Sequence, residues 1–324
     1  MPLWQANSLY CLAVVGLAAF GLWLSAPIVR LLQGMFPGMG SEALSLAVNA
    51  LFYGAVFFLP AAWLTRRCGA KERMRLKGLS PVGALIIAAL ALFGVLLAND
   101  VASLWSILLE ELGLALPDTG IEVASGRGGL VLQAVTMGML PGICEELLCR
   151  GVLLSAWEEA RGTRRAVCVS AFLFMTMHAS ITGAPSQFLL GWILGWLVVA
   201  ADSLFAGMIF HTTYNVWVLV LAGWLSSMPV SPEEEALAAQ SLFVQCGGWE
   251  GVITILIEAA MLGWICRMLL RIALRRKAAV EGWKPLPGRA EGIRMREVSF
   301  VIAGLAICAL LYAADLWSML GGGA

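Results

Sequence analysis

The chain has 324 residues, of which 60% are hydrophobic and only 13% are charged, and its formal net charge is zero. With a mean hydropathy of +0.86 it is too apolar for a soluble globular domain, and it has no basic surplus or basic-aromatic patch for binding nucleic acid. Its eight cysteines include no CxxC pair, so neither a disulfide framework nor a structural zinc site is indicated. The composition predicts a polytopic membrane protein.

Nine apolar segments are candidates for crossing the hydrocarbon core, which is ~30 Å thick and takes about 20 residues of helix. In chain order they cover 8–29, 43–64, 80–98, 129–157, 165–182, 187–202, 205–226, 248–270 and 298–318. None alternates apolar and polar residues as a strand of a membrane barrel would. The predicted fold class is therefore all-α, a polytopic transmembrane bundle of about nine helices.

We expect one integral membrane domain with three regions. Residues 1–128 hold the N-terminal helices. Within them, the segment 101–115 is short and apolar, and its acids are grouped together. This pattern predicts a separate helix on the outer surface. Residues 129–226 form a helical core, and residues 227–324 hold the C-terminal helices with a basic linker. The Lys and Arg residues of 65–78 and of that linker predict a cytoplasmic location for both and for the N-terminus.

Ionisable side chains at bilayer depth cost about 2.5–3.5 kcal/mol each on the translocon scale, so they commonly mark function. Six polar residues of the core, together with one further along the chain, fall in apolar segments, and they include both histidines of the protein. They are Glu145, Glu146, Arg150, His178, His211, Asn215 and, outside the core, Glu258. We expect the helices around 129–157, 165–182 and 205–226 to enclose a polar cavity inside the membrane.

Helical geometry arranges these residues. Glu146 and Arg150 are four apart and share a face, so they can form an ion pair. Glu145 is turned by ~100° from Glu146 and needs a partner on another helix. A hairpin turning near Gly162 would bring His178 to the same depth as Glu145, about 25 Å along the helices from the turn.

The same residues suggest a chemistry. A carboxylate beside an imidazole can take a proton from water. His211 and Asn215 are also four apart, which directs an imidazole and an amide at one spot, where their donors can stabilise an oxyanion. This combination is what water-dependent bond cleavage requires.

Three motifs occur in a fixed order: EELLCR reads as EExxxR, FMTMH as FxxxH and HTTYN as HxxxN. In order and spacing they resemble the CPBP family of intramembrane proteases, which includes the CAAX prenyl endopeptidases and the Abi proteins. The resemblance covers roughly 129–220. Ala201 and Asp202 stand where the family more usually has Thr-Gly before the last motif.

The resemblance implies a glutamate-dependent peptidase. Glu145 would activate water with His178, while His211 and Asn215 would stabilise the oxyanion. The remaining motif residues would hold the site together; these are Glu146 and Arg150. No metal or other cofactor is expected, and HExxH is absent, although zinc near Glu145, His178 and His211 is an alternative.

Family members cleave prenylated C-termini, leader or pro-segments, or membrane-anchored sorting tails. We therefore expect a membrane-anchored peptide or protein as the substrate, the lipid bilayer as the surroundings, and a bacterial inner membrane as the location. Glu258 has no motif around it, so it could help to bind substrate or simply join two helices.

Two other classes of function fit the same residues. A transporter also places Glu, His and Arg in the bilayer as a proton relay, but transporters commonly show repeated halves, and the chain has none. A non-catalytic membrane scaffold or immunity protein could carry the site without turnover. Proteolysis would distinguish the three.

Overall fold

The computed structural model describes residues 1–67, 74–117, 123–124, 126–288 and 294–321, and no strand occurs within these ranges. The predicted all-α fold is confirmed. The α-helices are α1 (Leu3–Ala19), α2 (Ser25–Met35), α3 (Ser41–Tyr53), α4 (Leu59–Arg67), α5 (Pro81–Glu111), α6 (Gly126–Gln133), α7 (Leu140–Glu146), α8 (Ser155–Arg161), α9 (Thr163–Met177), α10 (Ala184–Ala201), α11 (Leu204–Ser226), α12 (Pro232–Ala238), α13 (Leu242–Gln245), α14 (Gly248–Glu281) and α15 (Met295–Met319). Four π-helical segments join some of them without a break: η1 (Phe20–Leu24), η2 (Gly54–Phe58), η3 (Ala134–Met139) and η4 (Leu147–Leu154).

Eight helical segments of the described residues are long and apolar enough to cross a membrane. They are Leu3–Met35, Leu46–Arg67, Pro81–Glu111, Gly126–Arg161, Ala184–Ala201, Leu204–Ser226, Gly248–Glu281 and Met295–Met319. The other expected segment, 165–182, forms α9, which has only 15 residues and is about 22 Å long. It ends at Met177, so His178 begins a loop inside the bundle rather than continuing a helix.

The separate interfacial helix expected over 101–115 is not found. Residues 81–111 form the single 31-residue helix α5, which starts with Ser80 as N-cap and Pro81 in its first turn. The polar pair Asn99 and Asp100 does not break it, because Asp100 is buried against the bundle. One acid of its last turns makes a tertiary contact: Glu110 accepts a hydrogen bond of 2.6 Å from the amide of Leu242.

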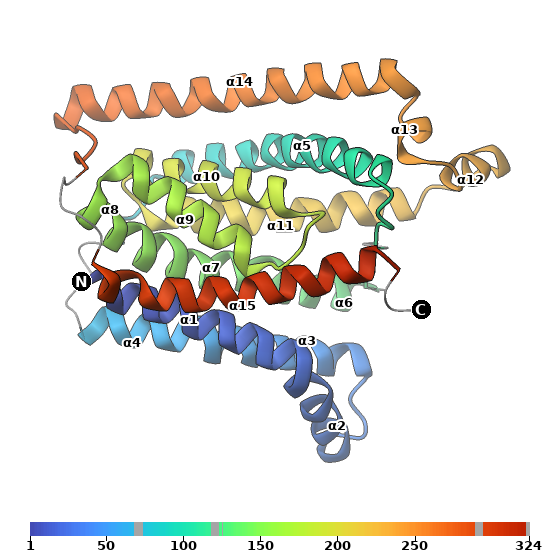
Figure 1. Ribbon diagram of the computed structural model, residues 1–324, viewed down its shortest axis with the longest axis horizontal. Coiled ribbons are helices and arrows are strands. Elements are labelled where there is room, and N and C mark those ends of the chain that lie inside the picture. The colour runs from blue at the N-terminus through green and yellow to red at the C-terminus, as the bar shows by residue number, and fades with distance from the viewer. Residues whose placement is uncertain (68–73, 118–122, 125, 289–293, 322–324) are drawn as a thin grey trace.

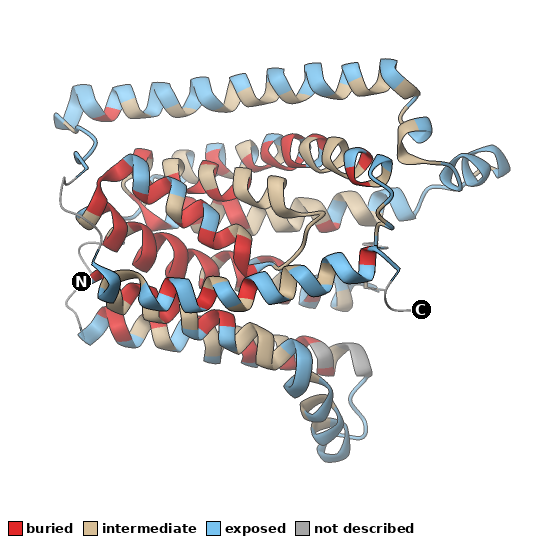
Figure 2. Ribbon diagram, in the orientation of Figure 1, coloured by how far each residue is buried: buried red, intermediate tan, exposed pale blue. Residues whose placement is uncertain are grey.

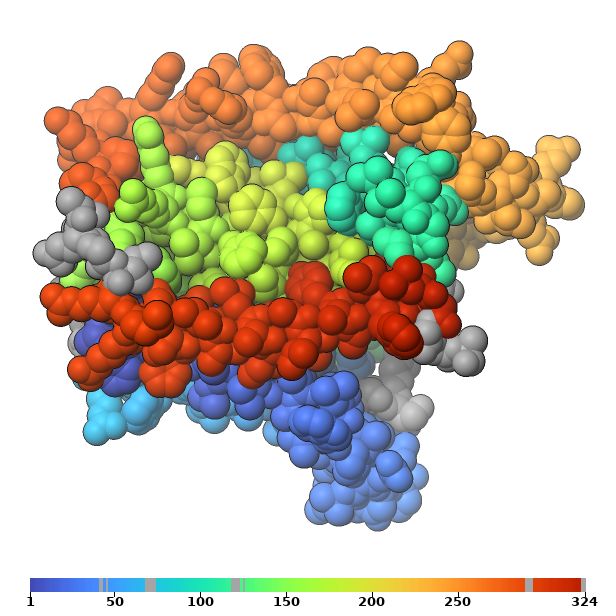
Figure 3. Space-filling model, viewed as in Figure 1, coloured from blue at the N-terminus to red at the C-terminus, as the bar shows by residue number. Residues whose placement is uncertain are grey.

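The long helices run roughly along one common direction (Figure 1). α7, α9, α10 and α11 lie in the middle, α14 lies along one side beside α5, and α1 to α4 lie on the opposite side. Buried residues concentrate in the middle, whereas α14 is exposed along most of its length (Figure 2). Figure 3 shows α15 crossing one face of the molecule, where it packs on α1.

One end of the bundle gathers basic residues, and we call it the basic end. There the amine of Met1 lies 3.5 Å from Glu159, and a guanidinium nitrogen of Arg161 lies 2.8 Å from Glu297. The N-terminus, the α8–α9 turn at Gly162 and the start of α15 therefore lie together at this end. The C-terminal end of α15 lies at the opposite end of the bundle (Figure 1). Residues 68–73 and 289–293, parts of the two basic segments, are outside the described ranges.

The α10–α11 turn is joined to the basic end by a cluster around Asp202. The carboxylate of Asp202 forms ion pairs with Arg75 at 3.2 Å, with Lys277 at 3.4 Å and with Lys77. Arg75 also forms an ion pair with Glu158 at 2.5 Å. Partial burial acts to raise the pKa of Asp202, but the hydrogen bond from Lys77 and the charges of Lys277 and Arg75 outweigh it and hold the pKa below its usual value. The cluster fixes the start of α11, the helix that carries His211.

Gly142 permits the close contact of α7 with α11. A Cβ at this position would lie 2.7 Å from the backbone nitrogen of Thr212 and 2.9 Å from its Cα. We therefore expect Gly142→Ala to reduce the free energy of unfolding by about 1–3 kcal/mol through overpacking. Thermal unfolding in detergent measures this effect. Gly21→Ala, where a Cβ meets nothing within 4 Å, is the control and should change stability little; equal losses in both variants would contradict the packing explanation.

Candidate active site

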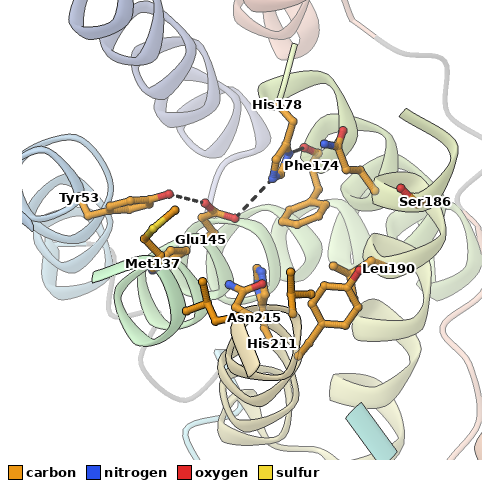
Figure 4. A pocket seen from close by; sticks show the side chains of 14 residues that line it. Tyr53, Met137, Glu145, Phe174, His178, Ser186, Leu190, His211 and Asn215 are labelled. Carbon is orange, nitrogen blue, oxygen red and sulfur yellow. Dashed lines mark hydrogen bonds and ion pairs between the residues drawn. The ribbon is translucent and has the colours of Figure 1, made fainter. Parts of the chain in front are cut away.

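A cavity of about 370 Å³ opens in the middle of the bundle, and all four residues expected to take part in chemistry line it. Its walls come from α3, η3, α7, α10, α11 and the end of α9 (Figure 4). The lining residues are Tyr53, Met137, Pro141, Glu145, Phe174, His178, Ser186, Gln187, Leu190, His211, Tyr214, Asn215, Val218 and Leu219. The predicted polar cavity is therefore present in the structure.

Glu145 is held between two other helices. The residue is 7% exposed, and its Oε1 accepts a hydrogen bond of 3.1 Å from the hydroxyl of Tyr53 on α3. Its Oε2 lies 4.0 Å from Nε2 of His178, at the end of α9. Glu145 thus finds its partners on other helices, and the hairpin brings it to the depth of His178 as the sequence predicts (Figure 4).

The imidazole of His178 is oriented by its own helix. Nδ1 lies 2.8 Å from the carbonyl oxygen of Phe174. A carbonyl can only accept, so Nδ1 carries the proton in this contact. Nε2 of the neutral ring is then unprotonated and faces Glu145. The Phe174 and His178 rings also meet edge to face at 4.7 Å, which restricts the imidazole further.

The loop after His178 is irregular backbone at the depth of the cavity, where unpaired backbone groups are costly. Two distant side chains satisfy the peptide groups of Ile181. Its amide donates to Asp315 on α15 at 2.7 Å, and its carbonyl accepts from the indole of Trp105 on α5 at 2.8 Å. Ala179 adopts a left-handed φ of 47°, an uncommon conformation for a residue with a side chain. The loop therefore holds the end of α9 in one place.

Beneath the cavity lies a buried charge network. Glu146 and Arg150 are both fully buried and pair at 2.6 Å, as their spacing predicts. Arg150 also donates to the carbonyl of Gly191 at 2.9 Å and stacks on the ring of Phe174 at 4.5 Å. Neither charged residue lines the cavity. Through these contacts the Glu146–Arg150 pair joins η4 to α9 and α10 beneath the cavity.

The same carboxylate orients the second histidine. Nδ1 of His211 lies 3.1 Å from Oε1 of Glu146, so Nδ1 donates and Nε2 is left for the cavity. Asn215, one turn further along α11, lies on the same side of the cavity as His211 (Figure 4). Its amide lies 3.5 Å from the carbonyl of Gly138.

The ionisable residues fall into two pairs rather than one cluster. Glu145 approaches His178, and Glu146 approaches His211. Over the described residues, no three His, Cys, Asp or Glu side chains are grouped closely enough to hold a metal ion. Glu258 is not brought to the site: it is exposed on α14 and does not line the cavity.

Two features of the site were missed by sequence reasoning. Tyr53 lies far before the motifs, and the signal for it was its hydroxyl in a predicted membrane segment, since a buried tyrosine usually needs a hydrogen-bond partner. The second is the π-helical segment η4, which begins directly after Glu146. Such segments are frequent at functional sites, but no residue type announces them.

Comparison with known families agrees with the motifs. Residues 127–217 match the family model described as type II CAAX prenyl endopeptidase, Rce1-like. No curated protein and no solved structure matches the chain. The matched residues run from α6 to α11 and contain every charged and polar residue of the cavity except Tyr53. Through this region, the chain is similar to the CAAX prenyl endopeptidases, in agreement with the resemblance of its motifs to the CPBP family.

Proposed function

We propose that this protein is a glutamate-dependent intramembrane peptidase that cuts a membrane-anchored peptide or protein. The observation that carries the proposal is the convergence of Glu145 and His178 on one wall of a cavity whose other wall presents His211 and Asn215. The bilayer surrounds the cavity, so a substrate already held in the membrane reaches it more readily than a soluble one. A bacterial inner membrane with the basic end in the cytoplasm fits the positive-inside rule.

The first step is the activation of water. The 4.0 Å between Oε2 of Glu145 and Nε2 of His178 leaves room for a water oxygen within hydrogen-bond reach of both. Glu145 takes a proton from this water as its oxygen attacks the substrate carbonyl. The protonated carboxyl then gives the proton to the departing amine, so that water is divided between the two products.

The negative charge that develops on the carbonyl oxygen is stabilised from α11. Because Nδ1 of His211 donates to Glu146, Nε2 can donate to an oxyanion only when the ring is doubly protonated. Glu146 accepts the hydrogen bond from Nδ1 and holds the ring so that Nε2 faces the cavity. Asn215 adds a neutral amide donor on the same side. In this proposal Glu146 is a positioning residue, and His211 contacts the reacting atoms.

The test is proteolysis by purified protein in liposomes that contain a library of membrane-anchored peptides, with and without a strong zinc chelator. Cleavage that survives the chelator is expected. Cleavage that disappears with chelator and returns with added zinc would instead favour the zinc alternative near Glu145, His178 and His211. A folded protein that cuts no peptide would favour the scaffold, and proton-coupled uptake by the same liposomes would favour the transporter.

Tyr53 offers a finer test. Its hydroxyl donates to Glu145, so we expect Tyr53→Phe to lower kcat about 10-fold, in line with the loss of a hydrogen bond to a charged group, and to leave KM within about two-fold. The measurement is steady-state cleavage of the best peptide. Tyr214→Phe is the matched control, because the Tyr214 hydroxyl lines the same cavity but has no hydrogen-bond partner among the described residues. Equal losses in the two variants would show that the Tyr53 contact does not matter.

A further inference from the structure

A second hollow lies on the other side of α11, between α5, α10 and α14. Its volume is about 440 Å³, and it shares no lining residue with the cavity that holds Glu145. α14 lies along the side of the bundle next to α5 at this place (Figure 1). We call this hollow the lateral groove. Several of its rim residues are exposed, for example Ile86 at 54% and Ile272 at 54%, so it is open to the surrounding lipid.

The lateral groove is apolar with one exception. On α14 its lining residues Ile265, Leu269 and Ile272 follow helical spacing, and Arg276 is the next residue on the same face. Arg276 is exposed and makes no ion pair with any described residue. A charged guanidinium thus stands at one end of an apolar groove.

The position of Arg276 marks the membrane surface. The neighbouring Lys277 pairs with Asp202 at 3.4 Å and donates to the carbonyl of Val199 at 2.7 Å, so Arg276 lies level with the α10–α11 turn at the basic end. From Ile265 to Arg276 the rise along the helix is about 16 Å. This is about half of a hydrocarbon core of ~30 Å, that is, the depth of one leaflet.

We propose that the lateral groove is a binding site for an anionic phospholipid of the leaflet at the basic end. One acyl chain lies along the groove between α5 and α14, and the phosphate is held by Arg276. The charge argues for an anionic head group, because a guanidinium binds phosphate oxygens in pairs. The depth argues for a lipid, because the groove extends from the surface for the length of one acyl chain.

The lateral groove also reaches the helix of the candidate active site. Phe210 forms part of its wall, and the next residue, His211, faces the cavity on the other side. Gly94 of α5 allows Phe210 to approach, since a Cβ there would lie 2.7 Å from the end of the ring. A bound chain would therefore pack against the α11 segment that carries His211. The binding proposal itself does not rest on peptidase activity.

Native mass spectrometry of the purified full-length protein tests the proposal. The probes are phosphatidylglycerol and phosphatidylcholine with identical acyl chains. We expect at least five-fold stronger retention of phosphatidylglycerol by the wild type, and Arg276→Ala should lower that retention at least five-fold. Arg275→Ala is the matched control, because Arg275 is the adjacent exposed arginine but does not line the groove, and its retention should stay within two-fold of the wild type.

A second pair of variants tests the acyl chain. Ala273→Trp fills the groove and should abolish retention of both lipids, whereas Ala278→Trp, on an exposed position outside the groove, should not. Thermal unfolding in lipid-free detergent shows that each variant is folded. Equal effects of Arg276→Ala and Arg275→Ala, undiminished binding by Ala273→Trp, or a dimer in place of a lipid adduct would each overturn the proposal.

Discussion

Replacing Glu145 by Gln is expected to abolish peptide cleavage while leaving the protein folded. Gln keeps the size of the side chain and can still accept the hydrogen bond from Tyr53, but it cannot take a proton from water. A general base typically contributes about 10²–10⁴-fold to the rate, and a loss of this size is the expected result. The measurement is single-turnover cleavage of the best liposome-embedded peptide, with unfolding followed in parallel.

Glu258→Gln is the matched control for this substitution. Glu258 is also a glutamate within a predicted membrane helix, but it is exposed on α14 and lies outside the cavity. We expect cleavage by this variant to stay within about two-fold of the wild type, since a surface substitution away from the site changes little. Full activity in Glu145→Gln would remove the proposed base. A complete loss in Glu258→Gln with normal folding would assign that residue to substrate binding after all.

The second large effect concerns stability. Arg150→Ala leaves the carboxylate of Glu146 buried without its cation, and it removes the contacts of Arg150 with Gly191 and Phe174. Breaking a buried ion pair from one side typically costs about 3–5 kcal/mol, so we expect a large drop in the midpoint of thermal or denaturant unfolding. Activity should be lost as well, because Glu146 also orients His211.

Two comparisons make this prediction specific. Arg164→Ala removes an exposed arginine at the start of α9 and should leave stability nearly unchanged. The double variant Glu146→Leu with Arg150→Met removes both charges and keeps apolar volume, so it should recover much of the lost stability while remaining inactive. If the double variant is as unstable as Arg150→Ala, the loss arises from packing and not from the uncompensated charge.

The sequence predicted the helical class and the position of most helices because a membrane helix must satisfy its own backbone and present apolar side chains outward. The same constraint made the polar residues of the core conspicuous. Local spacing was enough for the Glu146–Arg150 pair, since residues four apart share a helix face whatever the tertiary structure. The hairpin at Gly162 needed only the rise per residue to bring Glu145 near His178.

Helix ends were less predictable because they depend on distant contacts. The C-terminal part of α5 reads from sequence as a separate amphipathic helix, yet it continues α5. α9 stops at Met177 because the loop that follows is bonded to Trp105 and Asp315, which lie far away in the chain. The hydropathy of a segment does not reveal which distant side chains will bond to its ends.

The sequence by itself determined which residues can carry charge in the membrane and which of them share a helix face. Only the tertiary structure decided that Tyr53 contacts Glu145, that Glu146 contacts His211 as well as Arg150, and that Glu258 lies outside the cavity. These relations join helices far apart in the chain. They depend on how the helices pack and rotate against one another, and neither periodicity nor composition encodes that.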